Sequence, residues 1–459
     1  MSLFSNIFVL LIQTAIFLFV PKIIGKTEFA YWQLYIFYST YVNLANLGWP
    51  DGLHLKHGGQ ELESLNKSSI SGQYKVYLLF QTFITVLMLV GTAFYRGDVD
   101  KKAVLLLTFV FLFVSNVRQF ILLLFQTTNK IKEYATLLIM AKAVSAVLII
   151  VFFAFGIKDY RIVIATDIVG VVISLIIPLV RHRSLFLGRF RADHELKTEI
   201  LDNIRIGIKV ILAHYASVVI IGVVRFGIER SWDVDTFGEV SLMLSLSGLM
   251  MVFIQAISIV IFPMLKAEKN VQYGKLYSQI QPLTMQTLLL LLIFYYPIYW
   301  FMVAWLPQFA ESMKYLVFVF PLFVFEGKKA LLTNTFLKAN RNEKDIMYAN
   351  VTAVGVGIVL TVIFTVIYPN LMMVVLSIPL LTALSTYMSE LFLAKRIGIR
   401  LAKGIVLELM VCALFVVLVI FLEQWISFVC LILLLALSTL LNRKELKASW
   451  TYFRAVVKA

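Results

Sequence analysis

The sequence predicts an all-α polytopic membrane protein with about fourteen transmembrane helices. Hydrophobic residues make up 61% of the 459 positions and charged residues only 15%, whereas soluble domains are about half apolar and about a quarter charged. Apolar runs of about 20 residues, the length that a helix needs to cross the hydrocarbon core, recur along the whole chain. They group as two six-helix lobes followed by two additional helices.

The expected spans follow one another with short loops between them. In order, they are residues 3–20, 29–49, 75–95, 103–125, 135–156, 162–180, 208–228, 239–262, 283–305, 313–335, 349–368, 370–394, 405–422 and 425–441. The first run has neither a basic leader nor a small-residue cleavage site, so we interpret it as a retained span. The run at 313–335 contains the charged stretch EGKK and departs furthest from an uninterrupted apolar helix.

These spans divide the chain into four parts. They are an N-terminal six-helix lobe (1–180), a basic cytoplasmic linker (181–207), a C-terminal six-helix lobe (208–394), and two additional helices with a basic tail (395–459). The linker combines basic, acidic and apolar residues, which is typical of an amphipathic segment on the cytoplasmic headgroups. Membrane lipids are therefore expected to contact it.

Lysine and arginine are distributed unequally between alternate loops. One set of loops holds about three times as many as the other, and the loops on the cytoplasmic side of membrane proteins are the enriched ones. We therefore expect a multi-pass protein with both termini in the cytoplasm. The same distribution accounts for the net charge of +15. Nucleic acid is not expected as a partner, since no basic domain with interleaved aromatic residues is present.

A weak internal repeat supports the division into two lobes. Phe125 to Lys130 reads FQTTNK, and Phe336 to Arg341, 211 positions later, reads FLKANR. At the same offset Arg118 falls on Lys329. Two halves with the same topology form a parallel repeat, a plan that recurs in transporters with the substrate path at the repeat interface.

The second span ends in the stretch LGWPDGLHLKHGG, which carries a family signature. A tryptophan, an apolar run and the motif LG-x-x-DG make up the signature, and its residues are Trp32, Leu47, Gly48, Asp51 and Gly52. Together with the arrangement of six, six and two spans, this stretch resembles the Wzx-type polysaccharide-unit flippases of the MOP exporter superfamily, which act on O-antigen and other lipid-linked oligosaccharides.

The resemblance implies a function and a location. It implies that the chain moves undecaprenyl-pyrophosphate-linked oligosaccharide units from the inner to the outer leaflet of the bacterial cytoplasmic membrane. The expected mechanism is alternating access around a cationic cavity, coupled to an ion gradient or to the membrane potential, with no covalent chemistry and no cofactor. The polymerase of the same pathway is a further candidate partner.

The glycines and the proline of this stretch are expected to end the second span. Pro50 cannot continue a helical hydrogen-bond ladder, and Gly48 and Gly52 accept turn conformations. Asp51 is then expected to cap the turn that follows. We assign Gly48, Asp51, Gly52 and His54 to a structural turn that also contributes to a cytoplasmic gate.

Neither a metal site nor a catalytic site is expected. His54 and His57 have the spacing of one helix face, but no cysteine or acidic pair near them completes a coordination set. The sequence contains no phosphate-binding lysine loop, no nucleophile elbow and no HExxH motif. Cys412 and Cys430 lie inside apolar runs and are expected to be packing residues. We therefore predict a protein that is not an enzyme.

Charged residues inside spans are the candidates for substrate binding, because an ionised side chain in hydrocarbon is costly unless it faces a cavity or a partner. Arg118 and Lys329 are expected near the midplane of the two lobes, where a pyrophosphate could bind. Lys142 and Arg225 extend this cationic set. The alternatives are that Lys329 pairs with Glu326 and that the other cations snorkel to the headgroups or pair within their own lobe.

Two carboxylates and one aromatic face complete the candidate residues. Asp167 and Glu326 are candidates for ion coupling, with a counter-charge role as the alternative. The aromatic face consists of residues at three- and four-residue spacing on the second span, namely Tyr31, Trp32, Tyr35, Tyr38 and Tyr41. These rings are candidates for sugar contacts, with packing against a neighbouring helix as the alternative.

Two other functions compete with the flippase. A multidrug or metabolite cation antiporter of the same superfamily would share the first twelve spans, but cationic substrates favour a cavity lined with carboxylates, and the expected midplane residues here are Arg118 and Lys329. A membrane glycosyltransferase or polymerase would have large outer loops with catalytic clusters. The outer loops of this chain are short, which disfavours it.

The topology can be tested by cysteine labelling in intact cells. Ser184 lies in the linker and Ser231 in an outer loop, so an impermeant thiol reagent should label Ser231→Cys and leave Ser184→Cys unlabelled until the cells are opened. Labelling of Ser184→Cys from outside would contradict the predicted orientation.

Overall fold

The computed structural model describes residues 2–188, 194–267, 273–399 and 402–458, and the regular structure within these ranges is entirely helical. Ten helices in this part of the chain are long and apolar enough to cross a membrane, and Phe8–Ile24 is a shorter apolar helix. The prediction of an all-α polytopic membrane protein is therefore confirmed. The chain divides into two compact units, Met1–Tyr215 and Ala216–Ala459, with the boundary inside helix α9.

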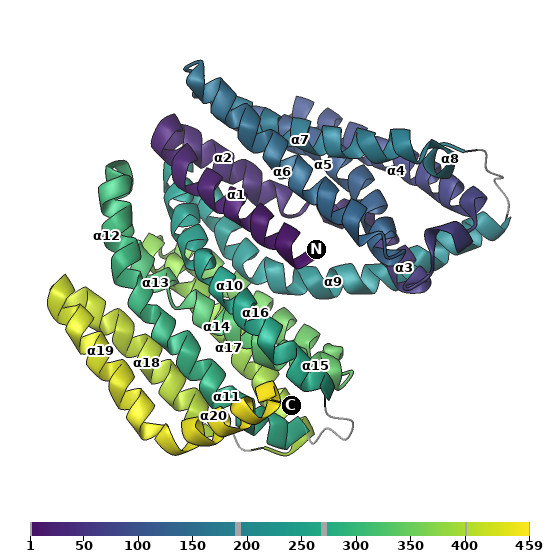
Figure 1. Cartoon of the computed structure of the whole chain (residues 1–459). Coiled ribbons are helices and arrows are strands. Elements are labelled where there is room, and N and C mark those ends of the chain that lie inside the picture. The colour runs from purple at the N-terminus through teal and green to yellow at the C-terminus, as the bar shows by residue number, and fades with distance from the viewer. Residues whose placement is uncertain (1, 189–193, 268–272, 400–401, 459) are drawn as a thin grey trace. The chain divides into compact units, whose positions relative to one another are not determined.

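The first unit is organised around α5. Its helices are α1 (Ser2–Ile24), α2 (Lys26–Ser39), α3 (Trp49–His57), α4 (Lys67–Ala93), α5 (Val99–Thr127), α6 (Ile131–Ala154), α7 (Tyr160–Arg181), α8 (Arg183–Phe186) and the first part of α9 (His194–Ser231). Helix α5 contacts α2, α3, α4, α6 and α7, and α1 packs on α6 (Figure 1). The middle of α5 is thus enclosed by other helices, and this is where Arg118 lies.

The second unit combines long helices with one fragmented segment. Its long helices are α10 (Val234–Ala267), α11 (Tyr273–Leu290), α12 (Tyr295–Trp305), α16 (Glu343–Val362), α17 (Leu371–Ile397), α18 (Ala402–Phe421), α19 (Gln424–Leu441) and α20 (Arg443–Lys458). The short pieces between α12 and α16 are α13 (Leu316–Val319), α14 (Leu322–Lys328), the π-helical η6 (Lys329–Thr333) and α15 (Asn334–Ala339). The pair α18 and α19 packs on α11 (Figure 1).

Four of the fourteen expected spans are not single α-helices. The expected span 283–305 consists of the end of α11, the 3-10 helix η3 (Leu291–Phe294) and α12, and the expected span 349–368 ends in the π-helical η7 (Ile363–Ile367). The expected span 29–49 consists of α2 followed by the 3-10 helix η1 (Val42–Asn46). The expected span 313–335 is the series from η5 (Ser312–Tyr315) to α15. The segments 29–49 and 313–335 are interrupted where the sequence places polar or charged residues among apolar ones, and neither contains a helix that satisfies the length criterion for a span.

The glycine-rich stretch after the second span folds differently from the expected loop. Leu47 and Gly48 adopt the left-handed conformation, with φ of 52° and 75°, and the chain then forms the helix α3 with Pro50 in its first turn. The N-cap is Gly48 and no side chain caps this helix. The expectation that Asp51 caps the turn is therefore wrong, because Asp51 lies within the helix.

Helix α9 begins at His194, well before the expected span 208–228, and its first part packs closely on α3. A Cβ atom at Gly207 would lie 1.7 Å from the carbonyl oxygen of Gly48, and one at Gly52 would lie 1.9 Å from that of Asn203. Asn203 is fully buried and donates from Nδ2 to Gln73 Oε1 at 2.8 Å. Three glycines thus allow two backbones to touch at the place where the signature motif lies.

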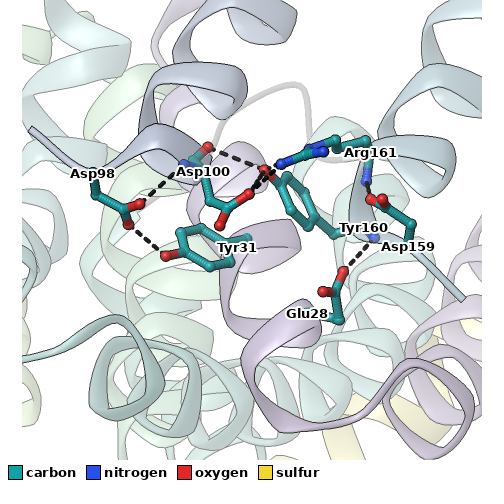
Figure 2. A network of polar contacts seen from close by, with 7 residues as sticks. All are labelled: Glu28, Tyr31, Asp98, Asp100, Asp159, Tyr160 and Arg161. Atoms are coloured by element: carbon teal, nitrogen blue, oxygen red, sulfur yellow. Dashed lines mark hydrogen bonds and ion pairs between the residues drawn. The ribbon is translucent and has the colours of Figure 1, made fainter. Parts of the chain in front are cut away.

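A polar network ties together the N-terminal ends of α2, α5 and α7 (Figure 2). Its members are Glu28, Tyr31, Asp98, Asp100, Asp159, Tyr160 and Arg161. Asp98 and Asp159 cap α5 and α7 by accepting from the backbone N–H of Asp100 at 2.9 Å and of Arg161 at 2.6 Å. Glu28 accepts from the N–H of Tyr160 at 2.7 Å. The network therefore fixes the three helices that carry Tyr35, Arg118 and Asp167.

The two units repeat one another at the ends of α5 and α15. Asn129 and Arg341, which are 212 positions apart, both have a positive φ, of 57° and 55°. The backbone bonds Lys130 N–H to Phe125 O and Asn342 N–H to Leu337 O, each 2.8 Å long, also differ by 212 positions. Both ends therefore form the same left-handed cap.

The equivalent positions at the two helix ends are 212 residues apart in the structure, which is one residue more than the 211 that the sequence repeat suggests. The π-helical turn η6 accounts for the difference, because a π turn holds one additional residue in an α-helix. Before that turn the offset is taken as 211, which makes Arg118 the counterpart of Lys329 in the repeat. The sequence alignment of FQTTNK with FLKANR, at an offset of 211, is therefore wrong by one residue at the helix ends. The alignment of Arg118 with Lys329 at the same offset is consistent with the structure.

The glycine contact predicts a strong effect of one added methyl group. Gly207→Ala places a Cβ against the Gly48 backbone, and overpacking of this kind typically costs roughly 1–3 kcal/mol. Thermal unfolding of the purified protein should show a lower midpoint. Gly355→Ala is the matched control, because this glycine of α16 is exposed and a Cβ there meets nothing within 4 Å. Equal midpoints for the two variants would contradict the close contact.

Candidate functional site

The interior of the first unit contains two cations and one carboxylate. Lys142 of α6 forms an ion pair with Asp167 of α7 at 2.6 Å, and Tyr35 of α2 donates to the other oxygen of Asp167 at 3.1 Å. Arg118 of α5 donates from Nη2 to the carbonyl oxygen of Leu137 at 3.2 Å and interacts electrostatically with Asp167. The cluster therefore carries an excess of one positive charge.

Arg118 is only partly satisfied by its surroundings. Its Nε atom is buried and has no hydrogen-bond partner in the described part of the chain. A guanidinium group has five N–H donors in a fixed planar fork that matches the oxygens of a carboxylate or phosphate. Free donors next to an excess positive charge make this a place where an anion would be stabilised.

The corresponding cation of the second unit is Lys329, at the start of η6. Its Nζ atom donates to Asn350 Oδ1 at 2.6 Å, to Ser385 Oγ at 2.8 Å and to Ser217 Oγ at 3.2 Å. All of these partners are neutral, and the lysine is only 5% exposed. Asn350 Nδ2 is also buried without a hydrogen-bond partner within the described residues. Lys329 is therefore a buried cation with a neutral shell.

The pairing of Lys329 with Glu326 is present as an electrostatic interaction without a direct ion pair among the described residues. The lysine points instead toward α9, α16 and α17, which supply its three partners. Glu326 thus acts on Lys329 at a longer range than its three hydrogen-bond partners do.

Arg225 lies apart from these two clusters. It belongs to α9, donates from Nη2 to Ser241 Oγ at 2.9 Å and lies over the ring of Phe237 at 5.1 Å. These contacts hold its side chain against α10. A serine and a phenyl ring of the same unit thus receive the guanidinium group.

The aromatic face of α2 packs largely inside the first unit. Tyr31 stacks on Tyr160 with ring centroids 5.1 Å apart and donates to Asp98, Trp32 is 7% exposed, and Tyr35 bonds to Asp167. Tyr38 is less deeply buried. The arrangement corresponds to the packing alternative for the first three rings, which are all buried; Tyr31 and Tyr35 also hold polar partners.

The two histidines of the stretch after the second span lie in the last turn of α3. His54 Nδ1 forms a hydrogen bond with Thr127 Oγ1 at 2.7 Å, and His57 Nδ1 forms one with Gln60 Oε1 at 3.0 Å. Burial raises the pKa of the Asp51 carboxyl, and the nearby His54 and His214 oppose that rise. The two histidines therefore bind different partners, and no cluster of metal-ligand type occurs among the residues described.

Sequence analysis missed one charged group, the buried set of Lys328, Glu390 and Glu408. The lysine is the neighbour of Lys329, but its side chain contacts carboxylates of α17 and α18. The glutamates within the apolar runs at 370–394 and 405–422 could have predicted this group, because an acidic residue inside a membrane span requires a partner.

Comparison with solved structures decides the fold. The lipid II flippase MurJ in an inward closed conformation aligns with a TM-score of 0.68 at 14% identity and covers 99% of both chains. An inward-facing multidrug resistance MATE family transporter of the MOP superfamily aligns with a TM-score of 0.57 at 12% identity, over 83% of this chain and 94% of that one. The chain has the fold that this flippase and this transporter share.

This fold agrees with the superfamily that the sequence resembles. No protein-family model matches the chain, and no match was found among curated proteins. At identities of 14% and 12% the likeness establishes the MOP-transporter fold and leaves the substrate to other arguments. The charged groups inside the two units provide those arguments.

The ion pair between Lys142 and Asp167 can be measured by a double-mutant cycle. Lys142→Met and Asp167→Asn each leave one charge without its partner, whereas the double variant removes both charges. Because the two side chains are 29% and 18% exposed, we expect a coupling free energy of unfolding of roughly 1–2 kcal/mol. Additive losses in thermal unfolding would show that the ion pair contributes nothing.

Proposed function

We propose that this chain is a flippase for an undecaprenyl-pyrophosphate-linked oligosaccharide unit, which it moves between the leaflets of the bacterial cytoplasmic membrane by alternating access. The substrate would be translocated without covalent change. Its pyrophosphate is the part that the protein must bind firmly, because that group carries the charge that hydrocarbon excludes.

The observation that carries the proposal is the neutral shell of Lys329. A buried ammonium group costs several kcal/mol unless a counter-charge compensates it. Ser217, Asn350 and Ser385 supply oxygens but no negative charge. Glu326 attracts this lysine without contacting it as an ion pair among the described residues. An anionic substrate would provide a direct counter-charge, so Lys329 favours an anion over a cation as the cargo.

The first unit supports the same interpretation. Arg118 occupies the position equivalent to Lys329 in the repeat and retains an unbonded Nε. Each unit therefore has one interior cation whose charge is incompletely balanced. The similarity of the fold to the lipid II flippase MurJ is consistent with a lipid-linked substrate.

The competing proposal is a multidrug or metabolite cation antiporter, as the fold of the MATE family transporter would allow. The carboxylates Glu390 and Glu408 of the second unit are the feature that favours it, because carboxylates attract cations. Both are already in contact with Lys328. A cationic substrate would have to displace that lysine, and this weakens the alternative.

The test is loss of substrate translocation on removal of either cation. Arg118→Ala or Lys329→Ala at normal protein levels should cause lipid-linked units to accumulate on the inner leaflet and the surface polymer to disappear. A charge-assisted hydrogen bond contributes about 1.5–3 kcal/mol, so we expect roughly a ten- to a hundredfold loss of transport. Arg118→Lys should also lose activity, since the bidentate fork is removed while the charge stays.

The control for these variants is Lys395→Ala, which removes an exposed lysine from the last turn of α17. Its transport should equal that of the parent. If the double variant Arg118→Ala/Lys329→Ala exports polymer at the parental rate, neither cation binds the substrate. Efflux of cationic drugs by the parent chain, with no effect on lipid-linked units, would support the antiporter instead.

A further inference from the structure

The second unit contains a buried triad of one lysine and two glutamates. Lys328 Nζ, at the end of α14, lies 2.5 Å from Glu390 Oε2 of α17 and 2.5 Å from Glu408 Oε2 of α18. The three side chains are 0%, 0% and 4% exposed. Three separate elements thus bring ionisable groups into direct contact away from solvent.

Within the described part of the chain, the other groups around the triad are hydrogen-bond donors and add no positive charge. Tyr277 donates to Glu390 Oε1 at 2.6 Å, Tyr387 donates to Glu408 Oε2 at 3.1 Å, and Gln281 donates from Nε2 to Glu408 Oε1 at 3.2 Å. Lys328 Nζ also lies 4.7 Å from the ring centroid of Tyr387. The other titratable neighbour is the buried thiol of Cys412.

Charge balance leaves this group one cation short. Two carboxylates and one ammonium would have a net charge of −1, and an uncompensated buried charge costs several kcal/mol. Two neighbouring carboxylates in such a place share a proton, because both cannot ionise without repulsion. The lysine already occupies the space between them that a metal ion would need, so a proton is the cation that fits.

We propose that Lys328, Glu390 and Glu408 form a proton-binding site that takes up and releases one proton during the transport cycle. The proposal rests on the proposed function as a transporter, and it moves ion coupling from Asp167 and Glu326 to the triad. Asp167 forms an ion pair with Lys142, so it needs no proton to balance its charge. The acidic excess lies in the second unit.

The position of Lys328 connects this site with the proposed substrate site. Lys328 is the last residue of α14 and Lys329 is the first residue of η6, so adjacent residues bind the two glutamates and the neutral shell. A rearrangement of this π turn would move both ammonium groups together. Proton release from the triad would strengthen its hold on Lys328, and this is the physical link through which proton loading would affect Lys329.

The proton can be observed directly by infrared difference spectroscopy of the full-length protein in lipid vesicles. Stepping the pH over a range in which exposed carboxyls stay ionised should reveal the C=O stretch of one protonated carboxylic acid, shifted in deuterium oxide. Glu390→Gln and Glu408→Gln each leave one carboxylate for one ammonium, so both variants should lose the band. Asp345→Asn, which removes a carboxylate paired with Arg396 at 3.1 Å, should keep it.

Absence of the band in the parent chain, or its retention in either glutamine variant, would overturn the proton site. The measurement on the parent needs no variant, so a variant that fails to fold does not prevent the test. It also needs no transport, so it stays separate from the proposed function.

Transport supplies the second arm of the test. A pH gradient should accelerate flipping of a fluorescent undecaprenyl-pyrophosphate oligosaccharide by the reconstituted parent, and Glu408→Gln should reduce that acceleration to a ratio of one. Flipping that proceeds equally with and without the gradient in the parent would overturn the coupling and leave the proposed function intact. If the carboxylic acid band titrates but the parent flips no substrate, the proton site is supported and the proposed substrate is contradicted.

Discussion

Burial of charged side chains among apolar helices is the constraint on which both units depend. An ionised group away from water must find a counter-charge, a shell of dipoles or a proton. The first unit uses an ion pair between Lys142 and Asp167, whereas the second unit uses a shell of neutral oxygens at Lys329 and a triad at Lys328. These groups hold six helices in register, because each helix must present its polar or charged group to a particular partner. The six are α5, α6, α7, α14, α17 and α18.

The two units share a helix-end geometry but differ in the charged groups of their interiors. Their caps at Asn129 and Arg341 have nearly the same φ angle and the same pattern of backbone bonds. Yet the described interior of the first unit has an excess of cations, while the second also includes buried carboxylates contributed partly by α18, one of the two helices that the sequence predicts as additions to the second lobe. The additional helices therefore contribute a charge to the interior of their unit besides covering its surface.

Much of the fold was predictable from the sequence, because long apolar runs define spans and their number defines the class. The sequence also paired Arg118 with Lys329. It did not show the π-helical turn, since insertion of one residue leaves hydropathy unchanged, and it did not show that α3 is helical, because glycine and proline usually end helices. The partners of Lys328 were hidden as well, since α17 and α18 approach it only through tertiary packing.

The π turn at 329–333 has a consequence for how the two halves differ. In an α-helix, one inserted residue rotates every later side chain by about 100° and would turn the end of the segment away from its neighbours. Here the widened turn confines that rotation to five residues, and the cap at Arg341 still matches the cap at Asn129. The second half has therefore gained a residue without loss of its packing, and two consecutive lysines point to different partners where the first half has a single arginine.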